Sequence, residues 1–238
     1  MNLVLFEADE IGATIPGQDP RAEHVRRTLR LKEEDTFAAG IINGPMGRAR
    51  LQVLTKLEMI IEFIPEKPAS LAFPLLLIVG LTRPQIAKHI FRESASMGIE
   101  KLWFYPTELG EKSYLDSDFW QEKNYRTQLI KGAGQGVTTH LPEVKISESL
   151  HRVLSEIPAD FERIALDNIR PVRSITPYQF QKNKIALLLG SERGLTEGER
   201  DHLENSGFVL LKMGERVLRT DTACIAGMTL VLSKLGKI

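Results

Sequence analysis

Two glycine-bearing segments each follow a short apolar run and carry charged residues beside their glycines. The first is Gly190-Ser191-Glu192-Arg193-Gly194, after Leu187-Leu188-Leu189, and the second is Met213-Gly214-Glu215-Arg216, after Leu210-Leu211. Glycine lets a ligand approach the backbone amides closely, so both segments are candidates for binding a small molecule. Either segment alone also fits an ordinary turn between a strand and a helix.

The sequence lacks the common phosphate-binding and hydrolase motifs. No glycine-rich loop ends in Gly-Lys-Ser/Thr, and the glycines at 132, 134 and 136 lack the dinucleotide spacing, because Val137 stands where the third glycine should be. No Gly-x-Ser-x-Gly elbow occurs. The one cysteine, Cys224, has apolar helical neighbours, which favours a core side chain over a nucleophile. ATP, NAD and hydrolase chemistry are therefore disfavoured.

Composition excludes several further classes. The 238 residues suffice for one or two domains, and 31 Lys plus Arg balance 31 Asp plus Glu, so net charge alone would not attract nucleic acid. The five histidines show no metal-ligand spacing and a lone cysteine forms no internal bridge, so we expect neither a metal site nor a disulfide. The longest apolar run, Leu75 to Leu81, is shorter than the ~20 residues of a membrane span, and the acidic N-terminal region does not resemble a signal peptide. We expect no membrane partner and a cytoplasmic location.

A basic cluster lies between Arg21 and Lys32. On a helix, Arg26, Arg27 and Arg30 would share a face suited to several phosphates of a folded RNA. A solvated helix face is the alternative, which the acidic residues at 33–35 favour. The RNA-binding candidates are His24, Arg26, Arg27 and Arg30.

The pattern of residues 1–66 predicts a small β domain. Apolar runs at Met1 to Phe6, Phe37 to Ile42 and Leu51 to Leu54 predict short strands, and the turn residues of Asn43 to Gly47 separate two of them. The two prolines of Pro65 to Pro68 fit neither a helix interior nor a central strand, so they predict a linker.

The remainder, 72–238, reads as an α/β domain. Apolar strands alternating with helices indicate a mostly parallel sheet covered on both faces, whose ligands bind beyond the carboxyl ends of the strands. Thr196 and Glu199 form a capping box at a helix start. The predicted strands are Pro74 to Gly80, Lys101 to Tyr105, Arg163 to Leu166, Lys184 to Leu189 and Phe208 to Leu211, and the predicted helices are Gln85 to Met97, Asp118 to Lys131, Ser147 to Ile157, one from Thr196 and one from Asp221 to Leu235.

Taken in order, these pieces resemble the bacterial ribosomal-RNA uridine-N3 methyltransferase family of the SPOUT superfamily. The family's Leu-Gly-x-Arg-Ile-Leu-Arg-x-Glu-Thr-Ala reads here from Met213 to Ala223, with Met213 for leucine and Asp221 for glutamate. Its Gly-Pro-Glu-Gly-Gly is altered, because Ser191 replaces proline and Arg193 replaces glycine. His24 followed by Leu29-Arg30-Leu31 adds to the likeness, which covers the whole chain.

Two further motifs depart from that family. Its Lys-Ala-Thr-Glu-Leu-Gly reads Glu93 to Gly98 here, and its Glu-Gln-Ser-Gly-Arg reads Gly134 to Thr138, so the charged positions 93, 96 and 138 are changed. Two alternatives therefore stay open: a SPOUT methyltransferase with another RNA target, or a non-catalytic RNA-binding paralogue.

The resemblance implies a PUA-like β-barrel domain, then a SPOUT-type α/β domain with a C-terminal trefoil knot, although chains generally avoid knots. It implies S-adenosyl-L-methionine as the cofactor, with its adenine between the two loops, and a homodimer whose sites both subunits complete. The partner would be ribosomal RNA or the assembled small subunit, and the product an N3-methylated uridine.

The same resemblance assigns roles to individual residues. Arg219 would favour an anionic uracil, with pairing to Asp221 or capping of a neighbouring loop as its alternative role. Glu192 would accept the proton or orient the cofactor, unless solvent accepts the proton. Thr222 would donate a hydroxyl to the cofactor. The other cofactor residues, of which the apolar members could instead be core, are Leu166, Leu189, Gly190, Gly194, Met213, Gly214, Leu218 and Ala223.

Overall fold

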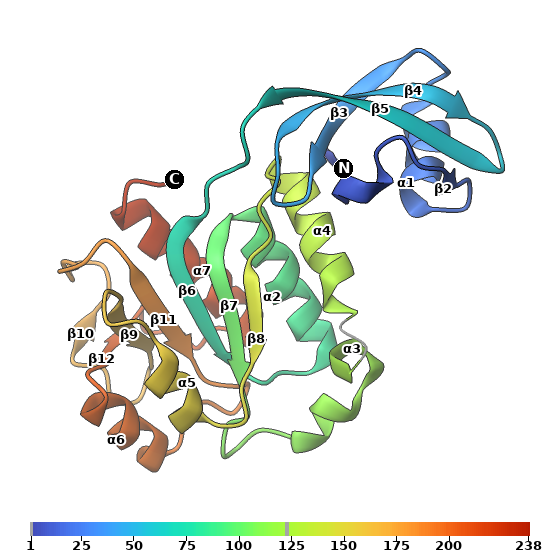
Figure 1. The fold of residues 1–238 in the computed structure, drawn as a ribbon. Coiled ribbons are helices and arrows are strands. Elements are labelled where there is room, and N and C mark those ends of the chain that lie inside the picture. The colour runs from blue at the N-terminus through green and yellow to red at the C-terminus, as the bar shows by residue number, and fades with distance from the viewer. Residues whose placement is uncertain (1, 122–123) are drawn as a thin grey trace. The chain divides into compact units, whose positions relative to one another are not determined.

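The structure, a computed structural model, describes residues 2–121 and 124–238, which form two compact units (Figure 1). The first unit contains the chain up to Leu71 together with Ala95–Gly98 and Ile130–Leu141. The second contains Ala72–Ser94, Ile99–Leu129 and Pro142–Ile238. Each unit has its own β-sheet.

The first unit holds a mixed sheet with the strand order β1-β3-β4-β5-β2. Strand β1 runs parallel to β3 and the other neighbours are antiparallel. Short helical turns connect β1 to β3. The bounds are β1 Val4–Phe6, η1 Ala8–Glu10, β2 Ile15–Pro16, α1 Pro20–Glu23, η2 His24–Leu29, β3 Thr36–Ile41, β4 Met46–Leu54 and β5 Glu58–Lys67.

The three apolar runs predicted as strands coincide with β1, β3 and the end of β4, although Met1 lies outside the described residues. Phe6, Phe37 and Leu51 of these runs lie in one buried cluster, which also contains Ile61 of β5. The predicted turn between β3 and β4 is also present, with Asn43 in the left-handed region at φ 55°. Asparagine tolerates that conformation better than most residues.

The predicted linker at Pro65–Pro68 is wrong for its first three residues, because β5 continues through them to Lys67. Pro65 pairs with Gly47 of β4. On the other side of β5, strand β2 pairs only with Met59 and Glu58. Beyond that contact β5 is an edge strand, where a proline without an N–H removes no ladder hydrogen bond.

The second unit holds a seven-stranded sheet in the order β10-β12-β9-β11-β6-β7-β8. All its paired strands are parallel, which confirms the predicted parallel α/β architecture. Strands β8 and β10 were not predicted, since both are short and β8 mixes polar with apolar residues. The bounds are β6 Phe73–Gly80, β7 Ile99–Tyr105, β8 Glu143–Ile146, β9 Glu162–Leu166, β10 Arg173–Ser174, β11 Ile185–Leu189 and β12 Val209–Lys212.

Most predicted helices are confirmed within a few residues. The single helix predicted over Asp118–Lys131 is instead divided into α3 and α4, and residues 122–123 between them lie outside the described residues. The helix predicted from Ser147 begins at Leu150, because the Ser149 side chain caps it by accepting from the Arg152 N–H. The bounds are α2 Pro84–Ser96, η3 Lys112–Asp116, α3 Asp118–Gln121, α4 Tyr125–Gly136, α5 Leu150–Glu156, α6 Glu197–Asn205 and α7 Thr220–Lys234.

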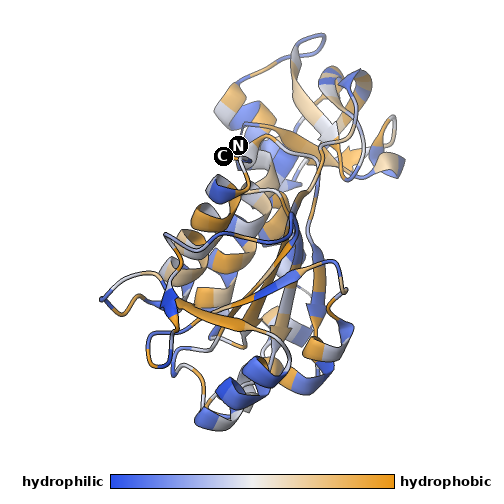
Figure 2. Ribbon diagram, turned by 90° about the vertical axis from the view of Figure 1, so that its left-hand side faces the viewer, coloured by the Kyte–Doolittle hydropathy of each residue, from blue (hydrophilic) through white to orange (hydrophobic). Residues whose placement is uncertain are grey.

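Helices cover both faces of the parallel sheet (Figure 1). Leu188 of β11 packs with Leu154 of α5 and Leu203 of α6. The preceding residue, Leu187, points to the opposite face, where its Cδ2 would lie 3.1 Å from a Cβ at Gly227 of α7. Apolar residues therefore run along β11 without alternation. Figure 2 shows hydrophobic stretches, in orange, along strands of the structure. Across the described residues, no helix has the length and apolar character needed to span a membrane.

Candidate functional site

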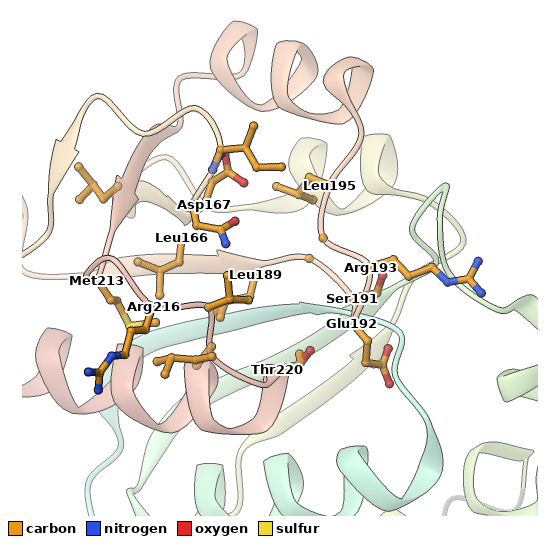
Figure 3. A pocket seen from close by; sticks show the side chains of 18 of the residues that line it. Leu166, Asp167, Leu189, Ser191, Glu192, Arg193, Leu195, Met213, Arg216 and Thr220 are labelled. Carbon is orange, nitrogen blue, oxygen red and sulfur yellow. Dashed lines mark hydrogen bonds between the residues drawn. The ribbon is translucent and has the colours of Figure 1, made fainter.

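A cavity of about 320 Å³ opens at the carboxyl ends of β9, β11 and β12 (Figure 3). This volume lies within the usual range of small-molecule sites. Three segments form its wall: the residues after β9, the loop after β11 and the loop between β12 and α7. The lining residues are Leu166, Asp167, Asn168, Ile169, Leu189, Gly190, Ser191, Glu192, Arg193, Gly194, Leu195, Arg200, Leu211, Met213, Gly214, Arg216, Val217, Leu218, Thr220 and Ala223.

The loop after β11 folds back on itself in a tight turn. The Gly194 N–H donates to the Ser191 carbonyl at 2.9 Å, and Gly194 has φ +76°, a conformation that suits glycine. The hydroxyl of Ser191 is buried and accepts from the Thr107 hydroxyl at 2.9 Å. Backbone and side-chain contacts therefore hold this loop in one shape.

The loop between β12 and α7 faces the first loop across the cavity. Figure 3 shows Met213 and Arg216 on one side and Ser191, Glu192 and Arg193 on the other. A Cβ built at Gly214 would meet nothing within 4 Å. The space beside Gly214 is thus open to a ligand.

Eight of the nine residues that the sequence assigned to a cofactor line this one cavity. Only Thr222 does not. It lies in a neighbouring hollow with His89, Arg219 and Asp221, at the start of α7 and on α2. The eight are Leu166, Leu189, Gly190, Gly194, Met213, Gly214, Leu218 and Ala223.

Glu192 lines the cavity and is held at its edge by the chain that leads into α2. Its Oε1 accepts a hydrogen bond from the backbone N–H of Arg83 at 3.0 Å. The Arg83 side chain in turn donates from Nε to the Tyr114 hydroxyl at 3.1 Å. The carboxylate is therefore oriented, and among the described residues its Oε2 has no hydrogen-bond partner.

Arg219 lies beside the cavity but not in its lining. Its side chain is 78% exposed, and its Nε lies 3.9 Å from Oδ1 of Asp221. Asp221 also approaches His89, with 3.5 Å between Oδ2 and Nδ1. The ion pair with Asp221 that formed the alternative role of Arg219 is thus present, and it is loose enough to leave the guanidinium free to turn.

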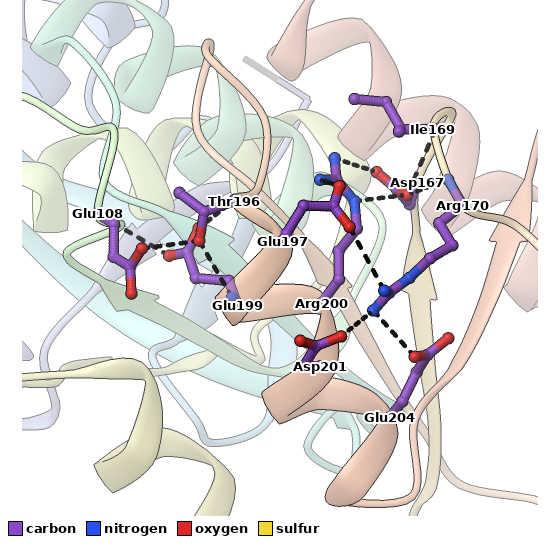
Figure 4. A network of polar contacts seen from close by, with 10 residues as sticks. All are labelled: Glu108, Asp167, Ile169, Arg170, Thr196, Glu197, Glu199, Arg200, Asp201 and Glu204. Atoms are coloured by element: carbon purple, nitrogen blue, oxygen red, sulfur yellow. Dashed lines mark hydrogen bonds and ion pairs between the residues drawn. The ribbon is translucent and has the colours of Figure 1, made fainter.

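Sequence reasoning missed a buried ion pair in the cavity wall (Figure 4). Arg200 of α6 donates from Nε and Nη2 to Asp167, which follows β9, at 3.0 and 3.1 Å. Burial opposes ionisation of Asp167, but the hydrogen bonds from Arg200 and from the Arg170 N–H outweigh it and lower the pKa of Asp167. The one sequence signal for this residue was an acid directly after the apolar run of a predicted strand.

A second arginine fastens the segment after β9 to α6. Arg170 reaches Glu197 at 3.4 Å, Asp201 at 2.7 Å and Glu204 at 2.9 Å (Figure 4). These contacts are partly exposed, so each contributes modestly, but three partners together restrict the segment. The cavity wall formed by residues 167–170 is therefore anchored at both ends.

The basic cluster of the first unit differs from its prediction. One helix was expected to present three arginines on one face, but η2 ends at Leu29 and Arg30 follows in the left-handed region at φ 56°. Arg26 donates to the carbonyls of Thr55 and Gly17 at 2.8 and 3.1 Å, so it ties the fold together. Arg27 is 74% exposed and approaches Glu23 at 3.9 Å. His24 begins η2.

Metal binding and thiol nucleophilicity are two other side-chain chemistries. Within the described residues, no three or more His, Cys, Asp or Glu side chains gather as metal ligands. Cys224 is buried in α7, and burial raises the pKa of its thiol far above the ordinary value. A protonated buried thiol is a poor nucleophile, in agreement with the predicted core role.

Comparison with known proteins identifies relatives of the whole chain. Residues 69–232 match a family described as an RNA methyltransferase domain. Ribosomal RNA small subunit methyltransferase E of Treponema pallidum is 36% identical over 98% of this chain and 91% of its own length. The corresponding enzyme E 1 of Borreliella burgdorferi is 33% identical over 99% of both chains.

A solved structure has the same fold as this chain. Ribosomal RNA small subunit methyltransferase E from Neisseria gonorrhoeae, solved with bound S-adenosyl methionine, superimposes with a TM-score of 0.79 at 21% identity. The match covers 98% of this chain and 97% of that chain.

Proposed function

The chain belongs to the family of small-subunit ribosomal RNA methyltransferases E, and from this membership we propose that it methylates ring N3 of a uridine in small-subunit ribosomal RNA. S-adenosyl-L-methionine is the methyl donor. The observation that carries the proposal is the single cavity that brings together eight of the nine predicted cofactor residues. The family match and the two relatives confirm the resemblance at the level of the family.

The residues of the cavity fit an adenosyl cofactor. An apolar surface suited to a flat base is formed by Leu166, Leu189, Met213, Leu218 and Ala223. The backbone groups of the two glycine-bearing loops can hydrogen-bond the polar edge of that base. The bound cofactor supplies an electrophilic methyl group on a sulfonium, and the protein's part is to hold the accepting nitrogen in line with it.

The uracil N3 carries a proton that must leave before the nitrogen can accept a methyl group. We assign the stabilisation of the resulting anion to Arg219, since it directly follows the cavity residue Leu218 and its loose pairing lets the guanidinium reach a base. Glu192, oriented by the Arg83 N–H, is the proton acceptor.

We assign a knot and a homodimer to this chain from its membership of the family. Strand β12 lies between β9 and β10, although β10 belongs to the connection from β9 to β11. This order supports a trefoil knot in a SPOUT-type domain over 72–238. Ile169 and Val217 line the cavity yet are 68% and 81% exposed, and Val172, three residues after Ile169, is 64% exposed. These exposed apolar side chains support a homodimer in which a second copy covers them.

RNA binding belongs in this proposal to a PUA-like domain over 1–66. Arg27 and Arg30 are exposed members of its basic cluster, and Arg30 lies just beyond the helical turn η2. Since Arg26 is engaged with carbonyls, it shapes the surface while Arg27 and Arg30 meet phosphates. Ribosomal RNA as the substrate gives the protein a cytoplasmic location.

Nucleoside mass spectrometry tests the proposal. Small-subunit RNA from cells with and without the gene should differ by one N3-methyluridine, restored by the wild-type gene and not by the Gly214→Val variant. Purified protein given naked RNA or assembled subunits would identify the form of the substrate. Loss of a different methylated nucleoside would overturn the assigned base, and an unchanged set of nucleosides in a strain lacking the protein would overturn the activity.

A further inference from the structure

The ion pair between Asp167 and Arg200 occupies an unusual position for two charges. Their side chains are 4% and 3% exposed, yet both residues line the cavity. Burying two charges costs free energy that their mutual attraction repays only with good geometry and further hydrogen bonds. The other hydrogen bonds of the pair therefore indicate its role in the cavity.

The two oxygens of Asp167 are unequally used. Oδ2 accepts from the Ile169 N–H at 3.3 Å, from the Arg170 N–H at 2.8 Å and from Arg200 Nε at 3.0 Å. Among the described residues, Oδ1 accepts only from Arg200 Nη2, at 3.1 Å. An ionised carboxylate oxygen has room for a further donor. Oδ1 is thus an acceptor that the protein leaves open in the cavity wall.

The charge balance indicates the kind of donor. Arg200 already neutralises Asp167, so the pair as a whole offers little attraction to a cationic ammonium. A hydroxyl donor suits it better, because a neutral hydroxyl still gains from a charged acceptor. The ionised form of Asp167 persists well into the acidic range, since its pKa is lowered in the folded protein. Its oxygen therefore acts only as an acceptor at neutral pH.

The location of Asp167 indicates which hydroxyl groups would donate to its carboxylate. It directly follows Leu166, a member of the apolar surface suited to the base, and Figure 3 shows the two side by side at the end of β9. The group attached to a base on that surface is its sugar. We propose that Asp167 accepts hydrogen bonds from the ribose hydroxyls of the adenosyl cofactor through Oδ1, and that Arg200 is the positioning residue that aims the carboxylate. This inference rests on the proposed function.

Calorimetric titration with three ligands tests the inference. The ligands are S-adenosylhomocysteine, 5′-methylthioadenosine, which lacks the amino-acid part, and the 2′,3′-dideoxy form of 5′-methylthioadenosine. Wild-type protein should bind methylthioadenosine about 10- to 100-fold more tightly than its dideoxy form, the range for a hydrogen bond to a charged group. In Asp167→Asn this preference should fall several-fold, while affinity for the dideoxy form stays unchanged.

A double variant guards against misfolding of the single one. Asp167→Asn with Arg200→Gln removes both charges, so neither is left buried alone, and it should also lose the preference for the intact ribose. Glu197→Gln is the matched control, because Glu197 pairs with the same Arg200 at 2.9 Å but is 66% exposed. It should keep the wild-type preference.

The other outcomes overturn the inference. An equal loss for all three ligands in Asp167→Asn would mean that the carboxylate only supports the structure. A loss for S-adenosylhomocysteine alone would mean that it binds the amino-acid ammonium. Failure of the wild-type protein to bind any ligand would refute the proposed function itself, whereas wild-type binding with an unchanged ribose preference in both variants would refute only the role of Asp167.

Discussion

Gly80, the last residue of β6, lies so close to Ser191 in the loop after β11 that a Cβ at Gly80 would be 2.5 Å from the backbone nitrogen of Ser191. A side chain there would also meet Cγ2 of Thr107 at 2.5 Å. We expect Gly80→Ala to displace the loop, lower the free energy of unfolding by about 1–3 kcal/mol and weaken S-adenosylhomocysteine binding. Denaturant unfolding and calorimetry measure the two effects.

The matched control for Gly80 is Gly198→Ala in α6. A Cβ at Gly198 would have the Thr196 hydroxyl at 3.9 Å as its nearest contact, and alanine favours a helix over glycine. This variant should be as stable as the wild type or more so, with full cofactor affinity. Equal affinity in Gly80→Ala would show that the loop does not need this close approach.

Gly214→Val should separate cofactor binding from folding. Because a Cβ at Gly214 would meet nothing within 4 Å, we expect the fold to accept valine there, while the valine side chain takes up space in the cavity. We expect the thermal midpoint to change by no more than a few degrees while S-adenosylhomocysteine binding falls below detection, with Gly214→Ala in between. Unchanged affinity in the valine variant would remove Gly214 from the assigned site.

Arg219 should affect the chemical step and not cofactor binding. Because its side chain is exposed beside the cavity, we expect Arg219→Ala to lower kcat about 100-fold, the effect of losing one donor to a developing anion, with unchanged S-adenosylhomocysteine affinity. Single-turnover methylation measures the rate. If Asp221→Asn lowers the rate equally, the arginine acts only through that ion pair and its assignment to the uracil anion is wrong.

The roles of Arg27 in η2 and of Arg30 just after it can be tested by the salt dependence of RNA binding. Each phosphate contact contributes about one to the slope of log affinity against log salt, so Arg27→Gln and Arg30→Gln should each weaken binding and flatten that slope. Filter binding to small-subunit RNA at several salt concentrations gives both quantities. Lys237→Gln, near the C-terminus in the second unit, serves as the charge-matched control and should keep the wild-type slope.

The stability of the first unit should depend on pH through Arg21. Its guanidinium donates to Glu10 and Asp19 at 2.6 to 2.9 Å. The bond from Arg21 lowers the pKa of Glu10, and for Asp19 burial opposes ionisation but the same guanidinium outweighs it and lowers the pKa.

Arg21→Gln should therefore cost about 2 kcal/mol of local unfolding free energy at pH 7. A carboxylate whose pKa is lowered in the folded state stabilises that state above its unfolded pKa of about 4. This stabilisation is lost as the pH falls through the folded-state pKa, so the cost of Arg21→Gln should shrink below about pH 4. Hydrogen exchange at amides of β1 and β3 reports it. A cost independent of pH would assign the effect to packing of Arg21 over the Phe6 ring.

Local patterns in the sequence were sufficient for five of the seven strands of the parallel sheet, the capping box of α6 and the two glycine-bearing loops. Each depends on residues close in the chain: an unbroken apolar run, a threonine three residues before a glutamate, or a glycine after a strand. The convergence of these loops on one cavity was also predictable, because the carboxyl ends of parallel strands meet at one edge of a sheet.

Tertiary structure alone decided which polar groups share the cavity. Asp167 and Arg200 are 33 positions apart and meet because α6 packs beside the end of β9, an arrangement that no short spacing encodes. The direction in which α7 begins puts Thr222 in the neighbouring hollow, although Ala223 beside it lines the cavity. Pro65 could join β5 only because β2 is too short to cover that edge. Each outcome depends on how elements pack, which is a property of the whole fold.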